Sequence, residues 1–329
     1  MVGVSNTKYN NTNLLIEIQA RLYYDKLKDF GYSEEQIASV IQRLRSEDPN
    51  YYPYLLGALV YLIQINLYQK MDVPTIRKTL KDLTNSLFSS IHDRLEYILD
   101  KALNWEYYFL LGHGVPGEKF YYPEFRSLHG SVYKVPLPSE ALELFLKYLS
   151  KEFSNIEDPS EKVIIKYLKD YLRKKIGELK KYEKENLPKL LEEGVKRIVE
   201  TYRILKPIIK RYSTYAEDIE NIARDSLNKI ENEYEKGNLS YDYHFKLHMI
   251  NRKLNYATEM IKYIEDILKM LYLIGINRVP IDKIMNLLNK TEDPLSNLKE
   301  TYKLLSSEQL KFINCEIMKK DWDWCTKRQ

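Results

Sequence analysis

The sequence contains few cysteine, glycine and proline residues. Of its 329 residues, only 2 are cysteine, 11 are glycine and 12 are proline. Two cysteines, Cys315 and Cys325, are too few for a disulfide framework or a four-cysteine metal site, although the count allows a single disulfide near the C-terminal end. Because glycine and proline are the residues that most often interrupt a helix, their scarcity predicts long helices.

The sequence also lacks the motifs that mark common catalytic and metal sites. The glycine-rich run 112–117 (GHGVPG) resembles a phosphate-binding loop, but no clear strand precedes it and no Gly-Lys-Ser/Thr follows. His244 and His248 are four residues apart on a predicted helix, yet no HExxH motif and no third ligand accompany them. We therefore predict no catalytic residue, no metal and no cofactor, and we expect a non-catalytic protein.

No segment of the sequence is typical of a signal peptide or a membrane helix. The beginning of the chain has no basic segment followed by an apolar run. Residues 50–69 carry no charge over a length that could span a bilayer, but Asn50, Pro53, Gln64 and Asn66 lower their hydropathy. These residues therefore predict a buried core helix, no membrane partner and a cytoplasmic protein.

The charges are numerous but almost balanced overall. The chain has 51 Lys and Arg residues, 47 Asp and Glu residues and 29 tyrosines, a bias typical of thermophile proteins that favours an archaeal source. Residues 161–211 differ, because they contain 16 basic and 8 acidic residues, a local charge of +8, so the rest of the chain carries −4. The local excess matters more for binding partners than the net charge of +4.

The spacing of apolar residues predicts an all-α fold. Gly31 is expected to end the first helix, and Ser33 with Gln36 forms a capping box at the start of the second. We expect a compact five-helix N-terminal domain over 1–105 and a connector over 106–138, with a small irregular or β insert near 112–138. A long antiparallel helical bundle is predicted over 139–275, followed over 276–329 by short helices and a tail that contains tryptophan and cysteine.

The predicted bundle contains a row of basic residues. We expect one helix up to Lys184, a second after Pro188, an acidic third over 213–236 and a fourth over 240–274 that ends at Gly275. At 100° per residue, the basic side chains of the first helix gather on one face, and those of the second repeat the pattern. The residues predicted to contact phosphate are Lys162, Lys166, Lys169, Arg173, Lys180, Lys184, Lys196, Arg203 and Lys210. Tyr167 and Tyr182 are near enough in sequence to join this surface. Two alternatives stay open: a solvated helix face, and internal pairing with the acidic helix.

The connector carries a second set of candidate residues. It combines histidine, aromatic and arginine side chains in a stretch rich in glycine and proline, which favours surface contact over chemistry. The candidate contact residues are His113, Phe120, Tyr121, Tyr122, Arg126 and His129.

Two segments carry a family resemblance. They are residues 54–90 (YLLGALVYLIQINLYQKMDVPTIRKTLKDLTNSLFSS) and 128–153 (LHGSVYKVPLPSEALELFLKYLSKEF). Both are similar to the helical domain of archaeal DNA primase large subunits. That resemblance implies a non-catalytic subunit that binds a catalytic partner and helps to hold the template. The chain departs from the family in its cysteines, because the family's iron–sulfur domain has four and this chain has two.

The sequence thus favours a non-catalytic, nucleic-acid-associated subunit of a larger archaeal complex in DNA replication, with a partner protein subunit. A helical large subunit of a CRISPR interference complex is one alternative, suggested by the predicted bundle. A structural or viral assembly protein is another, and it would use Trp322 and Trp324 as an anchor without binding nucleic acid.

Overall fold

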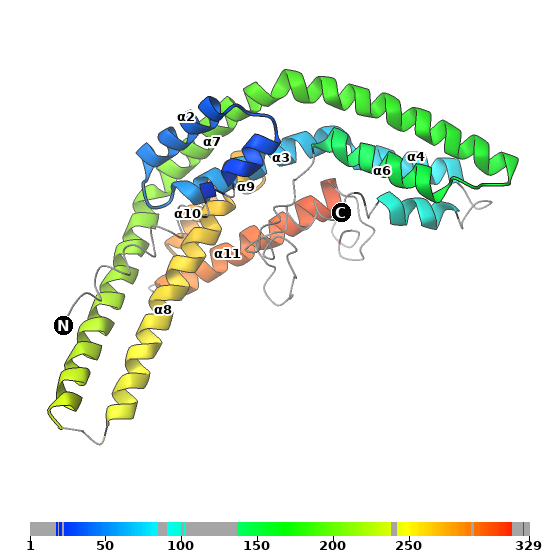
Figure 1. Ribbon diagram of the computed structural model, residues 1–329. Coiled ribbons are helices and arrows are strands. Elements are labelled where there is room, and N and C mark those ends of the chain that lie inside the picture. The colour runs from blue at the N-terminus through cyan, green and yellow to red at the C-terminus, as the bar shows by residue number, and fades with distance from the viewer. Residues whose placement is uncertain are drawn as a thin grey trace. The chain divides into compact units, whose positions relative to one another are not determined.

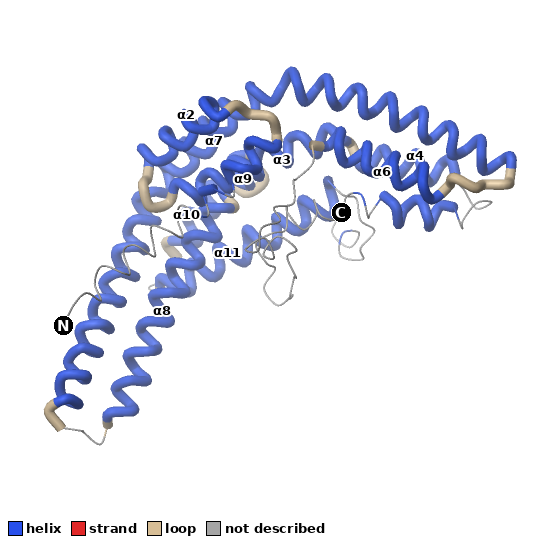
Figure 2. Tube along the Cα trace, in the orientation of Figure 1, coloured by secondary structure: helices blue, strands red, loops and turns tan. Residues whose placement is uncertain are grey.

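The computed structural model describes residues 18, 20, 21, 23–84, 91–99, 102, 137–237, 242–290, 293–317 and 325. Within these ranges the regular structure is entirely helical and contains no strand (Figures 1 and 2). The predicted all-α class is therefore confirmed. The predicted insert near 112–138 lies outside the described residues, apart from Leu137 and Pro138, where helix α6 (Pro138–Glu152) begins.

The chain divides into two compact units. The first unit comprises residues 1–196 and 308–329, and the second comprises residues 197–307. Helix α7 (Pro159–Glu235) contributes its first half to the first unit and its second half to the second. Each unit is described below by itself.

The centre of the first unit is helix α3 (Tyr52–Met71). Of its 20 residues, 17 are buried, so the helix has no solvent-facing side and is apolar all round. This confirms the predicted core helix. Among the described residues, no helix combines the length and the hydropathy needed to cross a bilayer. Around α3 lie α2 (Glu34–Glu47), α4 (Val73–Thr84), α6 and further helical residues at 23–29 and 91–99.

Local signals in the sequence place the start of α2. Gly31 has a φ of +96°, a left-handed conformation that favours glycine, and it ends the preceding helical segment as predicted. Ser33 caps α2: its Oγ accepts a hydrogen bond from the Gln36 backbone N at 3.2 Å, and the Gln36 side chain accepts one from the Ser33 backbone N at 2.9 Å. The predicted capping box is thus confirmed.

Helix α7 overturns part of the predicted bundle. It runs for 77 residues without interruption, so the breaks predicted at Pro188 and before the acidic stretch 213–236 are wrong. Proline in a helix interior removes one backbone hydrogen bond, but Pro188 is exposed and the helix buries apolar residues on both sides of it, including Ile176 and Leu191. Packing of this apolar face outweighs the local penalty. The acidic stretch is therefore part of the same helix as the basic row.

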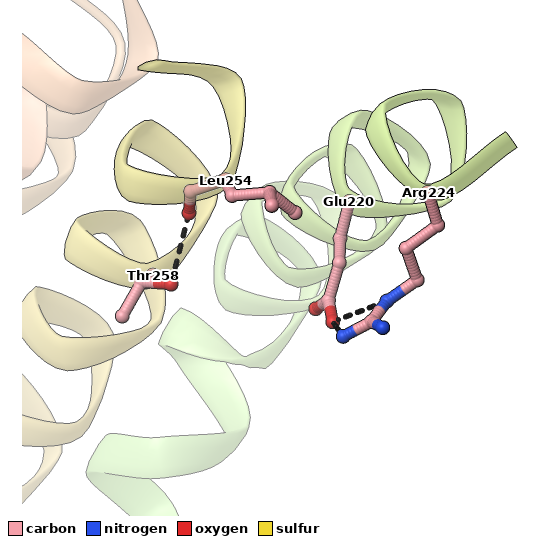
Figure 3. A network of polar contacts seen from close by, with 4 residues as sticks. All are labelled: Glu220, Arg224, Leu254 and Thr258. Atoms are coloured by element: carbon pink, nitrogen blue, oxygen red, sulfur yellow. Dashed lines mark hydrogen bonds and ion pairs between the residues drawn. The ribbon is translucent and has the colours of Figure 1, made fainter. Parts of the chain in front are cut away.

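The second unit is built on an antiparallel pair formed by the second half of α7 and α8 (Tyr243–Lys269) (Figure 1). Buried Ala223 and Ile230 of α7 pack with Ile250 of α8. Figure 3 shows Leu254 pointing from α8 toward α7, with Glu220 and Arg224 paired along α7. The acidic stretch thus lies against α8, whereas internal pairing with the basic row was one of the two alternatives that the sequence left open.

Three shorter helices complete the second unit. They are α9 (Leu271–Gly275), α10 (Ile281–Leu288) and α11 (Pro294–Lys311), whose last residues belong to the first unit. The predicted fourth helix is divided at Met270, and Gly275 lies inside α9 instead of ending the helix. The left-handed residue is Asn277, whose φ is 58°. An asparagine tolerates this conformation because its short polar side chain bonds locally.

A disulfide closes the C-terminal end of the first unit. It joins Cys315, in the π-helix η3 (Phe312–Ile317), to Cys325. The sequence had left this pairing open. Trp322 and Trp324, the anchor of the structural alternative, lie outside the described residues.

Candidate nucleic-acid interface

The basic row of the first unit lies on an exposed face of α7. Of its six members, Lys162, Lys166, Arg173, Lys180 and Lys184 are exposed, and Lys169 is half-buried. The apolar side chains of the same turns, including Ile165, Leu168, Leu172, Ile176 and Leu179, are buried. From Lys162 to Lys184 the row is about 33 Å long at 1.5 Å per residue, which is about the length of one turn of duplex DNA.

Two members of the row have acidic partners. Lys180 Nζ is 2.6 Å from Glu143 Oε1 of α6, and the hydrogen bond and charge of this carboxylate raise the pKa of Lys180. Arg173 Nη1 is 2.7 Å from Asp170 Oδ1, one turn away on α7. Both pairs are exposed, so each contributes little to stability and is readily exchanged for another anion.

The other four members have no carboxylate partner within the described part of the chain. No acidic side chain of the described ranges forms an ion pair with Lys162, Lys166, Lys169 or Lys184. An ammonium group that lacks an internal partner is available to neutralise a phosphate, and the release of cations condensed on the nucleic acid drives such binding. These four lysines are called the free lysine row below.

A buried carboxyl group fixes α7 against α6 beneath the row. Glu183 Oε1 accepts a hydrogen bond from the Ser139 backbone N at 2.8 Å, and its Oε2 accepts one from Ser139 Oγ at 2.6 Å. Burial of Glu183 raises its pKa, while the two hydrogen bonds from Ser139 oppose that shift. Because Ser139 is in the first turn of α6, this contact also satisfies a backbone N–H that has no partner within the helix.

The exposed face is wider than the predicted row. Tyr167 is 58% exposed and Val163 is 68% exposed, and Lys174 and Lys181 are exposed on the adjoining strip of α7. Of these four residues, the sequence had indicated Tyr167 alone. Val163, Lys174 and Lys181 were not predicted, although a rotation of 100° per residue along the helix places them beside Tyr167. An exposed tyrosine among lysines is the combination that stacks on bases while the cations hold phosphates.

The remaining predicted residues lie in the first unit, in the second unit or outside the described ranges. Tyr182, expected near the row, is half-buried with Lys70 Nζ 5.2 Å from its ring centroid. Lys196 is exposed and belongs to the first unit, whereas Arg203 and Lys210 are exposed and belong to the second. The candidate interface is therefore defined on the first unit alone. The contact residues of the connector, His113, Phe120, Tyr121, Tyr122, Arg126 and His129, lie outside the described residues.

Among the described residues, the histidine pair of α8 is not part of a metal-binding cluster. His244 and His248 are both exposed, and the His244 ring packs edge-on against Tyr243 at 5.6 Å between centroids. Across the described parts of the chain, no three His, Cys, Asp or Glu side chains are placed to hold a metal ion.

No family model matches the sequence, and no curated protein or solved structure matches it significantly.

Proposed function

We propose that the protein is a non-catalytic subunit that binds nucleic acid through the exposed basic face of α7 in the first unit. The free lysine row carries this proposal: four cations lie on one helix face over the length of about one duplex turn, without a carboxylate partner among the described residues. The similarity of residues 54–90 and 128–153 to primase large subunits favours a place in an archaeal replication complex with a catalytic partner.

The side chains of the site favour contact with the phosphate backbone of a nucleic acid over recognition of its base sequence. A single row of lysines meets phosphates as point charges, while exposed Tyr167 offers a ring face to an unpaired base. Neither group reads the edge of a base pair with a fixed pair of hydrogen bonds. We therefore expect binding with little sequence preference and, owing to Tyr167, a preference for single strands.

A charge-matched pair of variants tests the proposal. In the first variant, the free lysine row is replaced by glutamine: Lys162→Gln, Lys166→Gln, Lys169→Gln and Lys184→Gln. In the control, four exposed lysines of the same unit are replaced: Lys78→Gln, Lys81→Gln, Lys147→Gln and Lys151→Gln. Both variants lose the same charge, and circular dichroism checks that both stay helical.

Affinity for a fluorescent oligonucleotide is measured by anisotropy at low salt. The first variant should bind about 10-fold or more weakly than the control, because it loses the four proposed phosphate contacts. A combined loss of about 1.4 kcal/mol of binding free energy corresponds to a factor of 10. An equal loss of affinity in both variants would show that only the total charge matters, and it would contradict a binding site on the free lysine row. No binding by the unmodified protein would favour the structural or protein-interaction alternative.

A further inference from the structure

A hollow of about 290 Å³ lies in the second unit between α7 and the ends of α10 and α11. Its walls come from segments that are far apart in the sequence. Besides Tyr212 at its base, the hollow is lined by Arg211, Tyr215, Leu288, Asn289, Pro294 and Asn297. Its volume is at the lower end of the range for ligand sites, about 300 to 1,000 Å³, so it suits a small molecule.

A buried hydrogen-bond network makes the base of the hollow rigid. The Tyr212 hydroxyl donates to the Leu288 carbonyl oxygen, which joins α7 to α10. Asn297 of α11 is buried and its Nδ2 donates to the Tyr212 hydroxyl at 3.1 Å. Because three helices meet in this network, the hollow is preformed and a ligand would not have to order it.

Among the described residues, the groups that hold Arg211 over the hollow are neutral. Its Nη2 donates to Asn289 Oδ1 at 2.9 Å, and its guanidinium carbon is 5.3 Å from the centroid of the Tyr212 ring. Asn289 Nδ2 donates to the Met285 carbonyl oxygen at 2.9 Å, which turns the amide oxygen toward the arginine. None of the described carboxylates forms an ion pair with Arg211. The guanidinium is thus oriented and exposed, and no carboxylate of the described ranges is paired with it, which is the state that favours an incoming oxyanion.

Asp293, which precedes the lining residue Pro294, is already engaged in hydrogen bonds. Its Oδ1 accepts a hydrogen bond from the Tyr256 hydroxyl at 2.6 Å and one from the Leu295 backbone N at 3.2 Å. Burial and the bond to Asp293 raise the pKa of Tyr256 to about 12, so this hydroxyl keeps its proton near neutral pH. The carboxylate therefore caps the first turn of α11, and its charge is partly satisfied there.

The remaining walls are flat and largely apolar. Tyr215 is 43% exposed and Pro294 is half-buried, and both line the hollow. A tyrosine ring and a proline ring provide surfaces against which another planar ring can pack. We propose that the hollow binds a small ligand in which a compact oxyanion, phosphate or carboxylate, is attached to a flat ring. The oxyanion pairs with Arg211, and the ring packs against Tyr215 and Pro294.

Isothermal titration calorimetry on the full chain tests this site independently of oligonucleotide binding. The probes are AMP and phenyl phosphate for the phosphate source and benzoate for the carboxylate source. Benzyl alcohol supplies a ring without an oxyanion, and inorganic phosphate supplies an oxyanion without a ring. At least one of the first three probes should bind at millimolar concentration or below, and both half-ligands should bind about 10-fold or more weakly than that probe.

Three variants locate the binding. Arg211→Gln should weaken the preferred probe about 10-fold or more, since a hydrogen bond to a charged group contributes about 1.5 to 3 kcal/mol. Tyr215→Ala should weaken it less. Arg224→Gln is the control, because Arg224 is also on α7 in this unit but pairs with Glu220. Binding that is unchanged in Arg211→Gln, or no binding of any ring-bearing oxyanion, would overturn the proposal. Neither result bears on the free lysine row, which lies in the other unit.

Discussion

Replacing Gly194 by alanine tests the packing of α7 against α3. In an exposed helix interior, a change from glycine to alanine stabilises a protein by about 0.8 to 1.0 kcal/mol, because glycine loses more backbone entropy. At Gly194 the added Cβ would lie 2.6 Å from Leu59 Cδ1 and 3.4 Å from Leu62 Cδ2. Ordinary contact between carbons is about 3.5 to 4.0 Å, so one of the groups must move by about 1 Å.

The surroundings of Leu59 decide how much that movement costs. Leu59 is fully buried in a helix that is packed on all sides, so its side chain has no free space to enter. Overpacking of this kind typically costs about 1 to 3 kcal/mol. After subtraction of the propensity gain, Gly194→Ala should destabilise the first unit by about 0 to 2 kcal/mol.

Gly177 supplies a matched control on the same helix. It is exposed, and a Cβ added there would meet no atom within 4 Å. Gly177→Ala should therefore show the propensity gain alone, and the two variants should differ by the overpacking cost of about 1 to 3 kcal/mol. Both positions belong to the first unit, so urea unfolding followed by circular dichroism compares them on one transition. Equal stabilisation by both substitutions would refute the packing of α7 on α3 beyond Pro188.

Three further predictions concern the first unit. Pro188→Ala should stabilise it by up to about 3 kcal/mol in urea unfolding, because the helix is continuous there; a loss of stability would indicate a turn. The folded-state pKa of Glu183 is raised, so its protonated form is favoured by folding and its contribution to stability is lost as pH rises through that pKa. Glu183→Gln should thus destabilise the unit less at pH 7 than at pH 4, and the reverse order in pH-dependent urea unfolding would contradict the raised pKa. Reducing the Cys315–Cys325 disulfide, which spans 10 residues, should lower the free energy of unfolding by about 3 kcal/mol, and unchanged thermal unfolding after reduction would count against the closed loop.

Local chemistry made part of the fold predictable. The capping box at Ser33 and the left-handed Gly31 depend on neighbouring residues, so their sequence signals were sufficient. The burial of α3 was readable from its lack of charge. The continuity of α7 could not be predicted from the sequence. The local penalty of Pro188 is visible there, whereas the packing that outweighs it depends on tertiary contacts.

The two candidate sites differ in how far the sequence revealed them. The basic row follows from helical periodicity, and the structure adds which of its lysines have no carboxylate partner among the residues that it describes. The hollow beside Arg211 carries no motif, since its residues come from 211–215 and 288–297 and meet only through the packing of α7, α10 and α11.

The salt dependence of oligonucleotide affinity tests the proposed function most directly. Four phosphate contacts give a slope of log K against log salt of about −3, at 0.7 per contact for single strands. We expect Lys162→Gln, Lys166→Gln, Lys169→Gln and Lys184→Gln together to remove about 3 units of slope, while the control at Lys78, Lys81, Lys147 and Lys151 keeps it. An unchanged slope in the first variant, or an equal change in the control, would contradict the assignment of the free lysine row as the phosphate-binding face.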